Sequence, residues 1–223
     1  MTNVISRGIY YINSVLLCKI NKEFIQRSED VEAAAAEGDL RENEAYLSNL
    51  RKLSETNTKR ERILELQNNI KVEEEFYNDI KTDKIKKNTW YRILILTNDT
   101  DISTKTIENL NIFCTVYPAN MNEEFNNIFG ETLNNYKYII EMNTCFGTAS
   151  DEYTDYGYSS YNSPLFKNLE NHSKNTLLDI EFADQNNNSD VYYVTEITEE
   201  FFNKLKDMFI NEDIRYIPIN AGE

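Results

Sequence analysis

The feature that most constrains this chain is a helical pattern of apolar residues that fills its first 70 residues and is interrupted once. From residue 8 to residue 37 the apolar positions recur at helical spacing, as expected for a helix with one apolar stripe. They are Ile9, Ile12, Leu16, Ile20, Phe24, Val31 and Ala35. Gly38 and Asp39 then interrupt the pattern, and no proline occurs within it. The sequence therefore predicts one long helix that ends at Gly38.

A second helical pattern follows the interruption. Its apolar positions are Tyr46, Leu50, Leu53, Leu64 and Ile70, and the polar residues Asn57, Arg60 and Gln67 fall on the same stripe. A partly polar seam fixes the register of two paired helices at a cost in stability. Because only a short turn joins them, the helices are predicted to run antiparallel, as a coiled-coil hairpin within residues 1–82. With about 30 residues per helix, such a hairpin is about 45 Å long.

Beyond residue 82 the helical pattern gives way to short runs that are typical of β-strands. Aromatic, aliphatic and β-branched residues gather at 91–96, 112–117, 136–142, 176–182 and 191–197. Helices are predicted near 125–133, 162–169 and 198–209. Ser163 and Pro164 suit the N-cap and the first position of the second of these helices. Residues 88–223 are therefore predicted to form a mostly β domain, and the chain is predicted to be an α+β protein.

The charge of the chain bears on the class of its partners. The net charge is −15. Residues 1–80 carry 11 Lys and Arg against 15 Asp and Glu, whereas residues 81–223 carry 12 against 23. An acidic surface repels phosphate backbones, which argues against free nucleic acid as the main partner. A protein partner with a basic surface is the better expectation.

Membrane insertion and cysteine chemistry are both disfavoured by the sequence. No run of eighteen apolar residues occurs, so no transmembrane helix is expected. The cysteines Cys18, Cys114 and Cys145 are widely spaced and match no metal-binding pattern. Three separate thiols are typical of a protein in a reducing cytoplasm, which is where we expect this chain to act.

The interruption between the two helices allows two interpretations. In the structural interpretation, Gly38 ends the first helix, Asp39 caps the second, and Glu42 completes a capping box. In the functional interpretation, Asp39 and Glu42 stand at the tip of a long hairpin and present carboxylate oxygens, which suit Mg²⁺. Two carboxylates are too few to hold Mg²⁺ tightly. A second molecule would have to supply the other ligands.

The tip has the sequence GDLRENEAY, which resembles the hairpin-tip motif of the bacterial Gre transcript-cleavage factors. The matching residues are Gly38, Asp39, Leu40, Arg41, Glu42, Asn43 and Tyr46. A second similarity lies in YNSPLFKNL and the two predicted strands that follow it, which resemble the FKBP-like C-terminal domain of that family. The two matches cover residues 5–80 and 136–197.

The resemblance implies a mechanism. Gre factors insert their hairpin through the secondary channel of RNA polymerase while the globular domain docks outside. Asp39 and Glu42 would help the polymerase to hold its second catalytic Mg²⁺, which activates water to cleave backtracked RNA. Gly38 would shape the turn, and Asn43 and Tyr46 would position the tip. The resemblance implies a monomer when bound, with RNA contacted only at its 3′ end inside the polymerase and no stand-alone active site.

The chain also departs from the family pattern. The region 97–135 is predicted to be an insertion, and a helix near 198–211 is additional. Ala35 and Leu50 stand where Gre factors that grip RNA carry basic residues, and Glu44 adds a carboxylate near the tip. Two alternatives stay open: a secondary-channel regulator that inhibits without cleavage, and a coiled-coil adaptor unrelated to polymerase. The composition allows a bacterial protein or a viral one that acts in a bacterial host.

Overall fold

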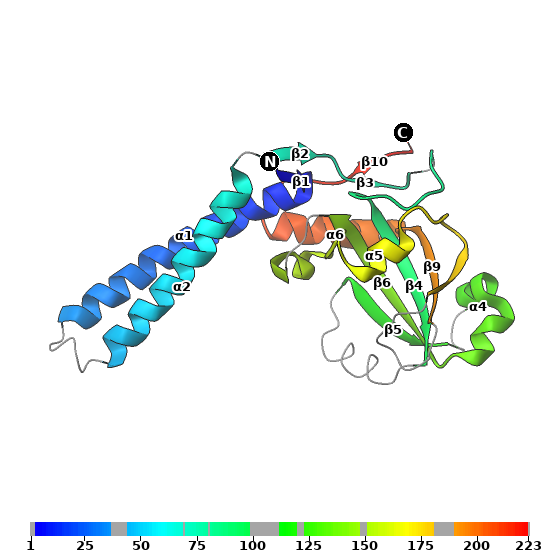
Figure 1. Ribbon diagram of the computed structural model, residues 1–223, viewed down its shortest axis with the longest axis horizontal. Helices are drawn as coiled ribbons and strands as arrows, with labels where there is room; N and C mark the ends of the chain where they lie inside the picture. Colours follow the sequence, from blue (N-terminus) through cyan, green and yellow to red (C-terminus); the bar gives the residue numbers. More distant parts are fainter. Residues whose placement is uncertain are drawn as a thin grey trace. The chain divides into compact units, whose positions relative to one another are not determined.

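The computed structural model divides the chain into two compact units, whose elements Figure 1 labels. The first unit is Met1–Glu73 with Ile210–Tyr216, and the second is Glu74–Phe209 with Ile217–Glu223. The structure describes residues 3–36, 44–68, 70–79, 81–98, 112–119, 123–147, 151–180 and 190–222. Helices and sheet are both present, so the predicted α+β class is confirmed.

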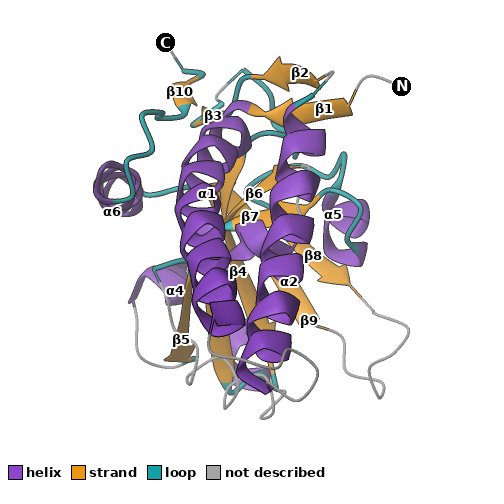
Figure 2. Cartoon of the chain, turned by 90° about the vertical axis from the view of Figure 1, so that its left-hand side faces the viewer, coloured by secondary structure: helices purple, strands orange, loops and turns teal. Residues whose placement is uncertain are grey.

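The first unit is a helical hairpin with a two-stranded sheet. Its elements are β1 (Asn3–Ser6), α1 (Arg7–Ala36), α2 (Glu44–Gln67) and β2 (Ile70–Glu73). The strands β1 and β2 pair in parallel, and the helices lie side by side (Figures 1 and 2). Both predicted N-terminal helices are therefore confirmed.

Hydrogen bonds between side chains on one helix and groups on the other show the direction of the pairing. Asn49 Nδ2 donates to the Asp30 carbonyl at 3.2 Å, Arg60 Nε to Asn21 Oδ1 at 2.7 Å, and Gln67 Nε2 to Ser14 Oγ at 3.3 Å. Residue numbers rise along α2 as they fall along α1, so the helices run antiparallel. Arg60 also lies over the ring of Phe24 at 5.6 Å. The seam is partly polar, as the sequence indicates.

One position of the predicted seam on α2 is wrong. Leu50 was predicted to lie in the seam but is 42% exposed, whereas Thr56 and Ile63 are buried. Buried or half-buried positions that follow alternating steps of three and four along α2 are Tyr46, Asn49, Leu53, Thr56, Arg60, Ile63 and Gln67. Asn49 lies against the backbone of α1, where its side-chain amide donates a hydrogen bond to the Asp30 carbonyl. The apolar character of Leu50 was therefore a misleading signal.

The second unit is built on a six-stranded sheet. Its strands are β4 (Trp90–Thr97), β5 (Cys114–Pro118), β6 (Tyr138–Gly147), β7 (Tyr158–Ser160), β8 (Leu177–Ile180) and β9 (Asp190–Glu196). The order is β5-β6-β4-β9-β8 with antiparallel neighbours, and β7 pairs in parallel with β6. All five predicted strands are thus present. The short strands β3 (Phe76–Tyr77) and β10 (Ile219–Asn220) form a separate parallel pair.

The helices of the second unit follow the sequence signals, except for η2, which was not predicted. They are α4 (Glu123–Phe129), the 3₁₀ helices η1 (Gly130–Asn135) and η2 (Asp151–Tyr156), α5 (Pro164–Leu169) and α6 (Glu199–Asn211). Ser163 caps α5 through its Oγ, which accepts from the Phe166 amide at 3.2 Å, so the predicted cap is confirmed. Within the predicted insertion at 97–135, the described residues supply α4, η1 and the sheet strand β5. Among the described residues, no helix has the length and apolar character to cross a bilayer.

The central strand β4 is buried on both faces because its alternate residues serve two cores. Tyr91 and Ile93 pack with Phe166 and Leu169 of α5 on one face. On the opposite face, Leu94 and Leu96 pack with Phe125 and Phe129 of α4 and Leu133 of η1. Arg92 lies on the same face of β4 as Leu94 and Leu96, so this otherwise apolar strand carries one charged side chain.

A second buried ionisable side chain is that of Glu75, which is fully inaccessible to solvent. Its carboxylate accepts a hydrogen bond from Trp90 Nε1 at 3.2 Å. It also accepts from the Tyr158 hydroxyl, at 3.0 Å and 2.9 Å to its two oxygens. Buried carboxylates require such donors because desolvation otherwise disfavours the charge. Glu75 thereby ties the start of the second unit to β4 and β7.

We expect Glu75→Ala to destabilise the second unit by about 2–4 kcal/mol, because two buried donors lose this acceptor. Urea unfolding followed by the fluorescence of Trp90, the only tryptophan, measures the change. The exposed Glu131 supplies the control, and Glu131→Ala should change stability by less than about 0.5 kcal/mol. Equal stability of the two variants would contradict a structural role for Glu75.

The seam register can be tested with two large-to-small substitutions on α2. Ile63→Ala removes a buried side chain and should cost about 2–4 kcal/mol of hairpin stability. Leu50→Ala should cost less than about 1 kcal/mol, because this residue is substantially exposed. Helical circular dichroism during urea unfolding reports both values. A greater loss of hairpin stability for Leu50→Ala than for Ile63→Ala would show that Leu50 lies in the seam, as the sequence predicts.

Candidate functional site

The predicted tip motif falls at the junction of α1 and α2. Six of its residues, Gly38, Asp39, Leu40, Arg41, Glu42 and Asn43, lie outside the described residues. Tyr46 is described, and it lies half-buried in the first turn of α2. The structure therefore brackets the motif between the end of α1 at Ala36 and the start of α2 at Glu44.

The helices define where the motif stands within the first unit. With 30 residues, α1 extends about 45 Å from β1 to its C-terminal end. Since α2 returns alongside α1, the motif joins the two helix ends that lie farthest from the β1–β2 pair. Glu44, at the first position of α2, is exposed. A long arm of this kind can carry a short acidic segment into a narrow space on another molecule.

The chemistry of the donor set limits what the motif can bind alone. Asp39 and Glu42 supply hard oxygen donors, which suit Mg²⁺, but this ion prefers six ligands and keeps several waters. Elsewhere in the described part of the chain, no three histidine, cysteine or acidic side chains are grouped so that they could hold a metal. A metal at the tip would therefore depend on ligands from a second molecule.

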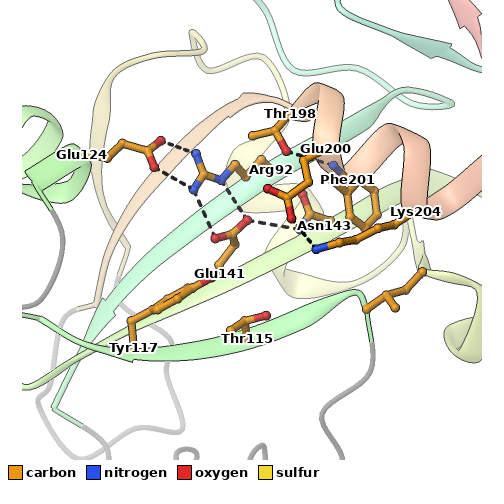
Figure 3. A pocket seen from close by; sticks show the side chains of 11 residues that line it. Arg92, Thr115, Tyr117, Glu124, Glu141, Asn143, Thr198, Glu200, Phe201 and Lys204 are labelled. Carbon is orange, nitrogen blue, oxygen red and sulfur yellow. Dashed lines mark hydrogen bonds and ion pairs between the residues drawn. The ribbon is translucent and has the colours of Figure 1, made fainter.

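The second unit contains a polar pocket of about 390 Å³ on the face of the sheet that carries Arg92 (Figure 3). The residues come from the strands β4, β5 and β6, from the helices α4 and α6, and from the segments just before β5 and α6. The lining comprises Arg92, Ile112, Thr115, Tyr117, Glu124, Glu141, Asn143, Thr198, Glu200, Phe201 and Lys204. The pairing of Arg92 with Asn143 and of Thr115 with Glu141 across the strands brings these polar residues onto one face.

Arg92 is held between two carboxylates. Its side chain is 8% exposed, that of Glu141 is 13% exposed and that of Glu124 is 48% exposed. Nε and Nη2 of Arg92 donate to the two oxygens of Glu141 at 2.9 Å and 3.1 Å. Nη1 and Nη2 donate to the two oxygens of Glu124 at 2.5 Å and 3.3 Å. Bidentate contacts of this kind fix the guanidinium in position as well as neutralise it.

Burial and hydrogen bonding act in opposite directions on Arg92. Desolvation disfavours its charge, but the hydrogen bonds and charges of Glu124 and Glu141 outweigh this and raise its pKa above the ordinary value. Burial, together with the charge of Glu141, also raises the pKa of Tyr117. The guanidinium therefore stays charged, and the Tyr117 hydroxyl stays protonated near neutral pH.

The rim of the pocket is formed by the first turns of α6. Thr198 caps this helix by accepting from the Phe201 amide at 3.1 Å. Lys204 and Glu200 form an exposed ion pair at 2.6 Å, and this pairing lowers the pKa of Glu200. The rim is thus charged and open to solvent, while Arg92 and Glu141 form the buried floor.

Two charged residues within apolar runs are a sequence signal for this pocket. Arg92 interrupts the apolar run YRILIL, and Glu141 interrupts the run YIIEM. Charged residues are rarely buried unless they are paired, so two opposite charges in neighbouring strands indicate a buried ion pair. The participation of Glu124 and Asn143 depends on the strand register and on α4, which no local pattern supplies.

Comparisons with known proteins show a weak structural similarity and no sequence relative. No protein-family model matches the chain, and no curated protein matches its sequence. The crystal structure of GreA factor homolog 1 (Gfh1) of Thermus thermophilus is similar over 89% of this chain and 100% of that chain. The identity is 8% and the TM-score is 0.33. A likeness at this level establishes neither a common fold nor a common function.

Proposed function

We propose that this protein is a transcription elongation factor that enters the secondary channel of RNA polymerase and stimulates cleavage of backtracked RNA. The observation that carries the proposal is the motif GDLRENEAY, which joins the ends of two long antiparallel helices. The motif is specific in sequence, and the hairpin is the kind of support that its function requires.

Asp39 and Glu42 act as ligands in this proposal, and their carboxylates complete a metal site that the polymerase supplies in part. Mg²⁺ bound there would activate water for hydrolysis of the RNA backbone. Gly38 allows the sharp turn, and Leu40 and Arg41 support the tip. Asn43 and Tyr46 orient it, and Tyr46 does so from the first turn of α2.

The arm and the acidic second unit have separate tasks in this mechanism. The arm needs length and stiffness, which the antiparallel pairing of α1 and α2 provides. The second unit, which we propose to be the FKBP-like domain of the family, docks on the polymerase as a protein–protein contact. Its sheet and the α5 helix that begins at Ser163–Pro164 agree with that assignment. A single arm fills a single channel, so the protein acts as a monomer.

This function needs no active site within the chain itself. The hydrolysis belongs to the polymerase, and RNA is contacted only at its 3′ end within the complex. We place the protein in the bacterial cytoplasm, as a cellular factor or as a viral one acting in a bacterial host.

A secondary-channel inhibitor is the alternative function, and the charge near the tip favours it. Glu44 exposes a further carboxylate at the start of α2, while Ala35 and Leu50 provide no positive charge to hold extruded RNA. Extra acids can alter how the tip presents its oxygens to a metal. An inhibitor would slow nucleotide incorporation and produce no shortened RNA.

We expect Asp39→Ala and Glu42→Ala each to reduce cleavage of a defined backtracked complex to the rate of the polymerase alone, because each removes one metal ligand. The assay follows end-labelled RNA in stalled complexes with wild type or variant protein. Glu55→Ala, an exposed position on α2 outside the tip, is the matched control and should retain full stimulation.

Three results would contradict the proposal in different ways. Equal cleavage by wild type and both tip variants would remove the role of the carboxylates. Slower incorporation without shortened RNA would identify an inhibitor. Failure of the full chain to bind core RNA polymerase in a pull-down would identify a coiled-coil adaptor, with Asp39 and Glu42 acting only as helix caps.

A further inference from the structure

The pocket on the sheet of the second unit contains a buried acceptor that has no donor among the described residues. Asn143 is 5% exposed and lines the pocket beside Glu141 (Figure 3). Its Nδ2 donates to Glu141 Oε1 at 3.4 Å, which fixes the orientation of the amide, since a carboxylate accepts and does not donate. No donor among the described residues reaches its Oδ1. Buried amide oxygens in folded proteins nearly always have a partner.

The charges around this oxygen determine which ligand fits. Two cationic side chains, Arg92 and Lys204, share the pocket with three carboxylates, those of Glu124, Glu141 and Glu200. The described residues of the lining therefore carry a net charge of −1. Arg92 already directs its hydrogen bonds to Glu141 and Glu124, and Lys204 is paired with Glu200. An anion would find no uncommitted cation here, whereas a cation would restore neutrality.

An ammonium group satisfies both requirements at once. It carries one positive charge and three N–H donors, which can reach an amide oxygen and neighbouring carboxylate oxygens. A water molecule could satisfy Asn143 Oδ1 but would leave the charge of the pocket unchanged. The exposed side chains of Glu200 and Lys204 at the rim leave the pocket open to a group from outside.

We propose that this pocket receives the side-chain ammonium of a lysine on a basic protein partner, with Asn143 Oδ1 as its central acceptor. The strongly acidic second part of the chain attracts a basic protein surface, which supplies such a lysine. The inference is independent of the proposed transcript-cleavage activity. It concerns docking by the second unit and makes no use of the hairpin tip.

The test uses the full chain and two small probes, Nα-acetyl-lysine N-methylamide and its uncharged analogue Nα-acetyl-norleucine N-methylamide. Two-dimensional NMR follows the side-chain amide signals of Asn143 as each probe is added at millimolar concentration. We expect the lysine probe to shift these signals in a saturable manner and the norleucine probe to leave them unchanged. Equal response to both probes, or no response to either, would overturn the proposal.

Variants show whether the site is the one described. Asn143→Leu keeps the approximate shape of the side chain and should weaken binding of the lysine probe about tenfold, measured by calorimetry. Glu200→Gln, at the exposed rim, should also weaken it, and this variant keeps the test decisive if Asn143→Leu fails to fold. Glu131→Gln, an exposed acid that does not line the pocket, is the matched control and should bind like wild type. Wild-type affinity in both pocket variants would refute the assignment.

A third probe distinguishes a lysine side chain of a protein from a free amine. Pentylamine carries a single ammonium, as the lysine probe does, without a peptide backbone. Binding of the lysine probe at least as tight as that of pentylamine supports a protein partner. Tighter binding of pentylamine would assign the pocket to a small amine and overturn the proposal.

Discussion

The antiparallel pairing of α1 and α2 is the constraint on which the proposed function depends. Their seam combines buried isoleucines with polar contacts, such as Arg60 to Asn21 and Asn49 to the backbone of α1. A purely apolar seam tolerates slippage by a heptad, whereas polar contacts specify one register. The register in turn fixes which residues occupy the junction, and those residues carry the acidic motif. A coiled coil with a polar seam is thus suited to holding a short segment at a defined distance.

The second unit uses buried charges for a different purpose. Glu75 is enclosed by Trp90 and Tyr158 and is satisfied by their donors, so it anchors the chain and is closed to ligands. Arg92 is also paired, but it lines a pocket with an exposed ion pair at its rim, and among the described residues no donor reaches Asn143 Oδ1 in that pocket. Glu75 therefore supports the fold, whereas we propose that the cluster around Arg92 takes part in recognising a partner.

Local patterns predicted much of this structure, and long-range contacts account for what they missed. The hairpin, the five strands and the Ser163 cap follow from periodicity and capping rules, which operate over a few residues. Leu50 was predicted to lie in the seam because it is apolar. In the structure its neighbour Asn49 lies there and donates a hydrogen bond to the Asp30 carbonyl of α1. The cluster around Arg92 joins three strands and two helices, so only strand register brings it together. The tip residues from Gly38 to Asn43 stay predictions, because the structure does not describe them.

We propose that the acidic segment 37–43, which joins the two helices of the hairpin, reaches the catalytic metal of RNA polymerase. When Fe²⁺ replaces Mg²⁺ in the polymerase and hydrogen peroxide is added, Fe²⁺ reduces the peroxide to hydroxide and a hydroxyl radical, and these radicals cut polypeptide in the immediate vicinity. With end-labelled protein bound to such a polymerase, we expect cuts concentrated in residues 37–43. Cuts confined to other segments, or none in a complex shown to be intact, would contradict it.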